Sequence, residues 1–148
     1  MEQKEEKIEL LKKSFLDEQK AFVSKIEDYS KNFRDLKKLI DLQILIFADR
    51  EIILEKKSRL VMSKIKIDKQ IREKKKKAFV NAKTNSDILL KSYNDINIYI
   101  DAELTGEMEK LELIEMQINF LIETIKTIDS VIFGIKNRIE LERILNGD

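Results

Sequence analysis

The chain has 148 residues, of which 43% are hydrophobic, and its 29 Lys and Arg nearly balance its 28 Asp and Glu. This length suits one domain, and the absence of proline together with only three glycines is typical of long helices rather than sheets. Cysteine and histidine are also absent, which excludes disulfides, thiol nucleophiles, imidazole bases and the usual zinc sites. We therefore expect an all-α protein of long antiparallel or kinked helices, not an enzyme, with no metal or cofactor.

Neither a secretory signal nor a membrane span is expected. Residues 1–7 are charged where a secretory signal turns apolar, and the longest apolar stretch, residues 44–48, is too short to cross a bilayer. We expect a cytoplasmic protein that has no membrane partner.

Apolar side chains recur every seven residues through the first half of the chain. Between residues 26 and 36 two such series interleave at steps of three and four, which places them on one face of a helix. The pattern predicts one long helix from about residue 5 to beyond residue 60, within an N-terminal region 1–80. The first series is Ile8, Phe15, Phe22, Tyr29 and Leu36, and the second is Ile26, Phe33, Ile40, Phe47, Leu54 and Val61.

A basic block closes this region, with eleven Lys and Arg against two acidic residues between positions 56 and 77. A narrow apolar stripe of Leu60, Ile67, Ile71 and Ala78 predicts that the block is helical. Residues 81–86 are the expected loop, because their Asn, Ser and Thr side chains compete for backbone hydrogen bonds. The basic residues are Lys56, Lys57, Arg59, Lys64, Lys66, Lys69, Arg72, Lys74, Lys75, Lys76 and Lys77.

The C-terminal region, 87–148, has the most regular heptad pattern. Ile and Leu alone fill its two interleaved series from residue 104 to residue 139, and Ile at both core positions favours three or more strands. We expect this region to assemble a homo-oligomer, with a break near Gly106 and a close helix contact at Gly134. The predicted assembly residues are Leu111, Ile114, Ile118, Leu121, Ile125, Ile128, Ile132 and Ile135.

The basic block has two interpretations. Clustered Lys and Arg suit the phosphates of a nucleic acid, whose contacts need charge rather than a precise motif. Alternatively, the block faces the acidic stretch 95–123 and holds two helices or subunits in register. Base-specific recognition is not expected, because the only candidate stacking platforms are Tyr29, Tyr93, Tyr99 and Phe79, and the first lies at a core position.

The order of these segments resembles the UvsY family, the recombination mediators of T-even bacteriophages. The similarity covers about residues 25–148. Val61, Met62 and Ser63 depart from it, because they stand where the family tends to have two aromatic residues and a Ser-Gly turn. The matching stretches are Tyr29-Ser30-Lys31, Lys57-Ser58-Arg59-Leu60, and residues 128–137 with Ile128, Ser130, Phe133, Ile135 and Lys136.

This resemblance implies a ring-shaped homo-oligomer that binds single-stranded DNA and helps a phage recombinase to displace the single-strand-binding protein in the host cell cytoplasm. Lys57 and Arg59 would then belong to the family's DNA-binding element, and no cofactor would be needed. The rival hypothesis is a cytoplasmic coiled-coil scaffold or chaperone that binds a protein partner. It explains the heptad series equally well, but it does not explain the basic block.

Overall fold

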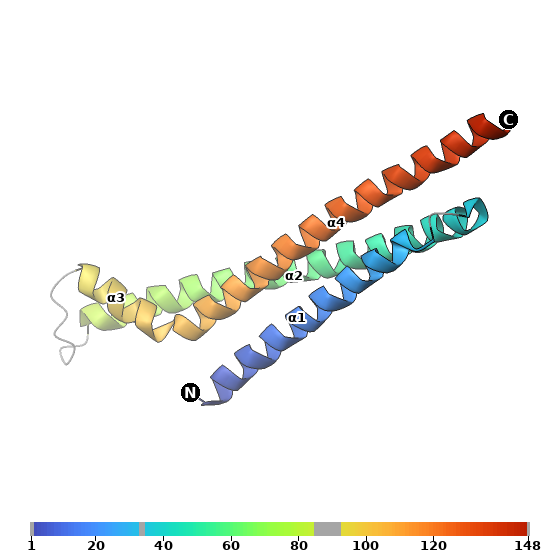
Figure 1. The fold of residues 1–148 in the computed structure, drawn as a ribbon. Helices are drawn as coiled ribbons and strands as arrows, with labels where there is room; N and C mark the ends of the chain where they lie inside the picture. Colours follow the sequence, from blue (N-terminus) through green and yellow to red (C-terminus); the bar gives the residue numbers. More distant parts are fainter. Residues whose placement is uncertain (1, 33–34, 85–92, 148) are drawn as a thin grey trace. The chain divides into compact units, whose positions relative to one another are not determined.

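The computed structural model describes residues 2–32, 35–84 and 93–147, and every regular element within them is a helix (Figure 1). The helices are α1 (Glu2–Ser30), α2 (Leu36–Thr84), α3 (Tyr93–Glu103) and α4 (Thr105–Asn146). The all-α prediction is therefore confirmed. No helix in these described ranges has the length and apolar character that crossing a membrane requires.

The single N-terminal helix that we predicted is wrong, because the chain breaks between α1 and α2. The hydroxyl of Ser30 donates to the carbonyl of Glu27 at 2.7 Å, a local bond that competes with the continuing helix. Beyond the break, a carboxylate oxygen of Asp35 accepts from the backbone N–H of Lys37 at 3.0 Å, which caps the start of α2. The heptad spacing continues across the break and does not reveal it.

Two later boundaries also differ from the prediction. The loop expected at 81–86 is helical up to Thr84, and its last two residues lie outside the described ranges. The break expected near Gly106 is confirmed, since α3 and α4 meet at Leu104. The described part of the single chain makes no close contact at Gly134, because a Cβ built there would have no neighbour within 4 Å.

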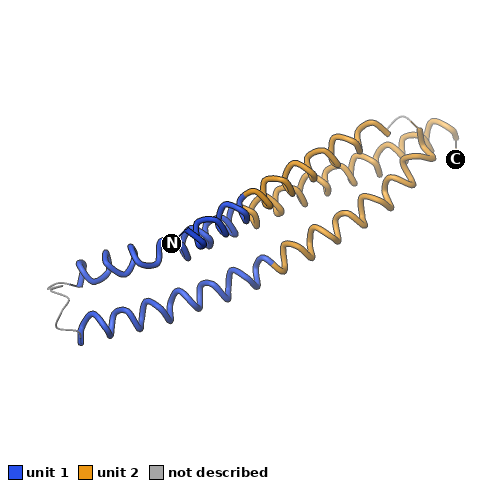
Figure 2. The backbone as a smooth tube through the Cα atoms, turned by 90° about the horizontal axis from the view of Figure 1, so that it is seen from below, with its two compact units in different colours: residues 1–12, 60–116 blue, residues 13–59, 117–148 orange. Residues whose placement is uncertain are grey.

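The chain divides into two compact units, each made of segments distant in sequence (Figure 2). Unit 1 comprises residues 1–12 and 60–116, and so contains the start of α1, the end of α2, α3 and the start of α4. Unit 2 comprises residues 13–59 and 117–148, which supply the remaining parts of α1, α2 and α4.

The core of unit 2 follows the heptad spacing, but on α2 it is displaced by one residue from our prediction. Phe22 and Tyr29 of the first series are buried as expected, whereas Ile40 and Phe47 of the second are 48% and 43% exposed. The residue directly before each of these two is buried instead. As a separate helix, α2 is rotated so that this neighbouring side faces the core. The fully buried side chains on α2 are Leu39, Ile46 and Ile53, and those on α4 include Leu121, Ile128 and Ile135.

Polar contacts join α1 to both α2 and α4 in unit 2. Asp49 of α2 is buried and accepts hydrogen bonds from the Tyr29 hydroxyl and, at 3.2 Å, from Lys25, both on α1. Burial and, secondarily, the bond to Asp49 raise the pKa of Tyr29 above its usual value. Gln19 donates to Gln117 at 2.9 Å between α1 and α4. These buried and partly buried polar bonds fix the alignment of the helices more specifically than apolar packing alone.

Candidate nucleic-acid interface

The candidate interface lies on residues 60–84, the part of α2 that belongs to unit 1. The apolar stripe predicted there faces the core, because Ile67 and Ile71 are buried and Leu60 and Ala78 are half-buried. A helix turns by about 100° per residue, so the surrounding basic residues fall into two groups, one beside the stripe and one on the side away from it.

The first group pairs with acidic residues of unit 1. Lys64 lies 3.2 Å from Glu115, Lys74 lies 2.6 Å from Glu107, and Lys75 lies 3.3 Å from Asp101. These contacts join α2 to α3 and α4. The basic block therefore does face the acidic stretch, as the second interpretation predicted, through at least these three lysines.

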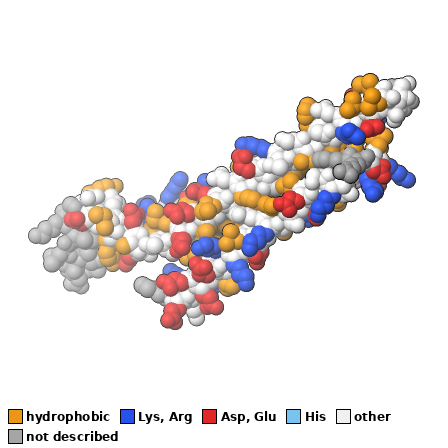
Figure 3. All heavy atoms as spheres, viewed as in Figure 1, with side chains coloured by type: hydrophobic (Ala, Val, Ile, Leu, Met, Phe, Trp, Pro, Cys, Tyr) orange, Lys and Arg blue, Asp and Glu red, His pale blue; other side chains and the backbone are white. Residues whose placement is uncertain are grey.

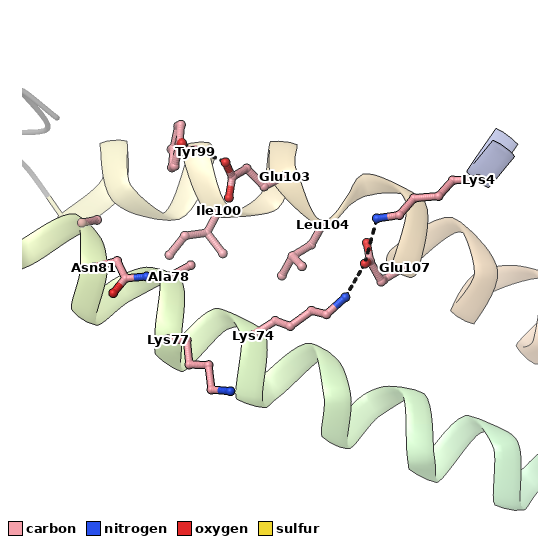
Figure 4. A pocket seen from close by; sticks show the side chains of 11 residues that line it. Lys4, Lys74, Lys77, Ala78, Asn81, Tyr99, Ile100, Glu103, Leu104 and Glu107 are labelled. Carbon is pink, nitrogen blue, oxygen red and sulfur yellow. Dashed lines mark hydrogen bonds and ion pairs between the residues drawn. The ribbon is translucent and has the colours of Figure 1, made fainter. Parts of the chain in front are cut away.

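Glu107 is the centre of this charged contact (Figure 4). Lys74 from α2 and Lys4 from α1, the latter at 3.7 Å, both reach its carboxylate. The hydrogen bond from Lys74 holds the pKa of Glu107 below its usual value despite partial burial. The ionised carboxylate and the two ammonium groups therefore stabilise one another.

A cavity of about 520 Å³ opens beside this contact, between segments of unit 1. Lys4, Lys74 and Lys77 line it together with Glu103 and Glu107, and Glu103 accepts a 2.8 Å hydrogen bond from the hydroxyl of Tyr99. That bond raises the pKa of the Tyr99 hydroxyl. Two carboxylates in the wall oppose a phosphate, so the cavity is a poor site for the backbone of a nucleic acid.

The second group lies on the sides of the helix away from the apolar stripe, and we call it the outward basic face. Its members are exposed, and none has an acidic side chain within 4 Å among the residues that the structure describes. Glu73 is the acidic residue that shares this side of the helix, so positive charge dominates it. The members of the outward basic face are Lys66, Lys69, Arg72, Lys76 and Lys77, of which Lys77 also lines the edge of the cavity described above.

Lys56, Lys57 and Arg59, the remaining predicted DNA-binding residues, belong to unit 2. Lys56 lies 3.4 Å from Glu18 and 5.3 Å from the centre of the Phe22 ring, so its charge is already engaged with α1. Arg59 is exposed and lies 2.5 Å from a carboxylate oxygen of Glu55, one helical turn earlier. Exposed pairs of this kind are weak, and Arg59 remains available to a phosphate.

The four aromatic residues considered as stacking platforms have different surroundings. Tyr29 is buried and bonded to Asp49, which excludes it, and Tyr99 is bonded to Glu103. Phe79 and Tyr93 contact each other edge to face, with ring centres 5.5 Å apart. The sequence gives both residues, but it contains no signal that α2 and α3 bring them together.

The residues predicted to assemble copies of the chain are instead largely buried within the single chain. Only Leu111 is half-buried, and the seven others form the inward side of α4. Assembly through them stays a prediction, and it would require the helices of the chain to separate. Apolar side chains do remain exposed on α4 toward its C-terminal end (Figure 3), namely Phe133, Leu141, Ile144 and Leu145.

The comparison with known families bears on the first interpretation of the basic block. A family described as "Recombination, repair and ssDNA binding protein UvsY" matches residues 53–148. The chain belongs to the UvsY family. No curated protein and no solved structure matches it.

The UvsY match confirms the resemblance drawn from the sequence. It begins three residues before the basic block, so the whole outward basic face lies inside it, whereas α1 lies outside. The family is described by DNA binding and recombination rather than by catalysis. The description of the family therefore indicates single-stranded DNA as its ligand.

Proposed function

We propose that this protein is a recombination mediator that binds single-stranded DNA through the outward basic face and helps to load a recombinase onto DNA coated by single-strand-binding protein. The observation that carries the proposal is the division of charge on α2. Three lysines are held by acidic partners of unit 1, while five basic residues on the other side have no described acidic partner within 4 Å and lie inside the region that matches the UvsY family.

The two groups have different roles in this mechanism. Lys64, Lys74 and Lys75 hold α3 and α4 against α2, which keeps the helix in place and directs the other basic residues outward. The outward basic face then neutralises phosphates and releases their counterions, so binding depends on charge and little on base sequence. Neither step needs a cofactor.

Repetition of this face in a homo-oligomer would strengthen binding. Several modest sites on one strand bind more tightly together than separately, because each contact raises the effective concentration for the next. The exposed apolar side chains Leu141, Ile144 and Leu145 at the end of α4 support self-association, since burying them in a second copy would remove apolar surface from water.

The loading role is tested by recombinase activity on single-stranded DNA that is already covered by single-strand-binding protein. We expect the wild-type protein to shorten the delay before the recombinase becomes active, and to have little effect on bare DNA. A variant with Lys69→Ala and Lys76→Ala should lose this effect. If the wild-type protein leaves the delay unchanged although it binds DNA, the loading role is wrong while the DNA-binding role stands.

A protein-binding scaffold is the second candidate, and one observation favours it. Ile40, Ile44 and Phe47 lie on one side of α2 in unit 2, at steps of four and three, and each is at least 43% exposed. An apolar stripe of this kind suits a protein partner. If Ile44→Ser and Phe47→Ser leave DNA binding intact but abolish loading, this stripe contacts a protein of the recombination machinery.

A further inference from the structure

Phe79 and Tyr93 form an aromatic pair at the end of α2 in unit 1. Their ring planes are inclined by 66° and their centres lie 5.5 Å apart, an edge-to-face arrangement that holds both rings in place. Tyr93 is the first residue of α3, which lies beside the end of α2 (Figure 1), and its side chain is 70% exposed. The contact with Phe79 therefore orients the Tyr93 ring without covering it.

A lysine lies against this pair. The ammonium group of Lys83 lies 4.6 Å from the centre of the Phe79 ring, a cation–π contact that places a cation next to the aromatic surface. Phe79 also continues the outward side of the helix, because Arg72, Lys76, Phe79 and Lys83 follow one another at steps of four, three and four. From Arg72 to Lys83 this side is about 16 Å long.

An exposed ring that is held in place near basic side chains is an arrangement by which proteins bind single strands without reading their sequence. Bases stack on the ring, since every base has a π face, while the cations contact the backbone. A duplex cannot use such a ring, because its bases are already stacked on one another. Charge alone attracts single and double strands alike, so the ring is what would distinguish them.

We propose that Tyr93, oriented by Phe79, stacks against a base of single-stranded DNA whose phosphates contact Lys76 and Lys83. This inference rests on the proposed function and adds a contact that the outward basic face does not supply. Lys83 lies outside the basic block defined from the sequence. The stacking contact is apolar and releases no counterions, so its share of the affinity persists when salt has weakened the phosphate contacts.

The direct test uses Tyr93→Trp, which introduces the only tryptophan of the chain. We expect its fluorescence to be quenched when a dT oligonucleotide binds and to be unaffected by a duplex of the same length. A matched control is Tyr99→Trp, on the same helix and 39% exposed, whose fluorescence should change little. Quenching at position 99 with none at position 93 would overturn the assignment.

Affinity gives a second, independent readout. Tyr93→Ala should weaken binding to the dT oligonucleotide roughly 5- to 150-fold, the range measured for loss of one stacked base, while Tyr93→Phe keeps the ring and should bind like the wild type. Helicity measured by circular dichroism checks that the variants fold. If Tyr93→Ala binds as tightly as the wild type, the stacking site is wrong and the phosphate contacts stand. If the wild type itself fails to bind, the proposed function is wrong as well.

Discussion

The division of the basic residues predicts that two substitutions of equal charge will have unequal effects. One double variant, Lys69→Ala with Lys76→Ala, removes two charges from the outward basic face. The other, Lys64→Ala with Lys75→Ala, removes two charges that Glu115 and Asp101 already neutralise within unit 1. Both variants change the net charge of the protein by the same amount. Any difference between them therefore reports position rather than total charge.

The expected size of the difference follows from counterion release. If each of the five residues of the outward basic face neutralises one phosphate of a single strand, log affinity falls with log salt at a slope of about −3.5. Removing two of them reduces this slope to about −2.1, whereas the paired variant should keep a slope near −3.5. A fourfold rise in salt should then weaken the outward variant about 20-fold and the paired variant about 100-fold.

Fluorescence anisotropy with a labelled oligonucleotide, titrated at several salt concentrations, measures both slopes. Thermal unfolding provides the control, because loss of two exposed ion pairs should lower stability by no more than about 1 kcal/mol each. Equal slopes for the two variants, or a shallower slope for the paired one, would refute the assignment of the outward basic face.

Three other outcomes follow from the structure. Leu121→Ala should lower the free energy of unfolding by about 2–5 kcal/mol in a denaturant titration, because this side chain is 0% exposed, whereas exposed Phe133→Ala should cost less than about 0.5 kcal/mol. The pKa of Glu107 is lowered in the folded protein, so its ion pair stabilises the fold fully above 4.5, the pKa of the unfolded chain, and loses that effect as pH falls through the folded pKa. The melting temperature of a Glu107→Gln variant should therefore fall less steeply in acid than that of the wild type. Changing Lys57 and Arg59 together to Ala should weaken DNA binding with helicity unchanged, and a loss larger than that of the outward double variant would place the family's DNA-binding element at these two residues.

The periodicity of the sequence was sufficient for the class of fold and for part of the core. Heptad spacing predicted helices and the burial of Phe22 and Tyr29, because an apolar stripe must face a partner whatever the connection between helices. It did not reveal the break after Ser30 or the displaced core of α2, since both depend on local hydrogen bonds and on how separate helices rotate against one another.

The candidate site was predictable in charge but not in arrangement. The basic block and its acidic counterpart were both evident from composition, yet only the packing of α2 against α3 and α4 separates Lys74, which is paired, from Lys76, which is exposed. Burial of Leu121 and its neighbours within the chain was also outside the reach of periodicity, because a heptad series does not state whether its partner is the same chain or another copy.

Binding of the intact protein to single-stranded oligonucleotides of different base sequence, measured by anisotropy between about 50 and 200 mM salt, tests the central claim most directly. We expect binding at low salt with little dependence on base sequence, and a loss of affinity of about 100-fold across this range. Absence of binding at low salt, or an affinity indifferent to salt, would contradict it.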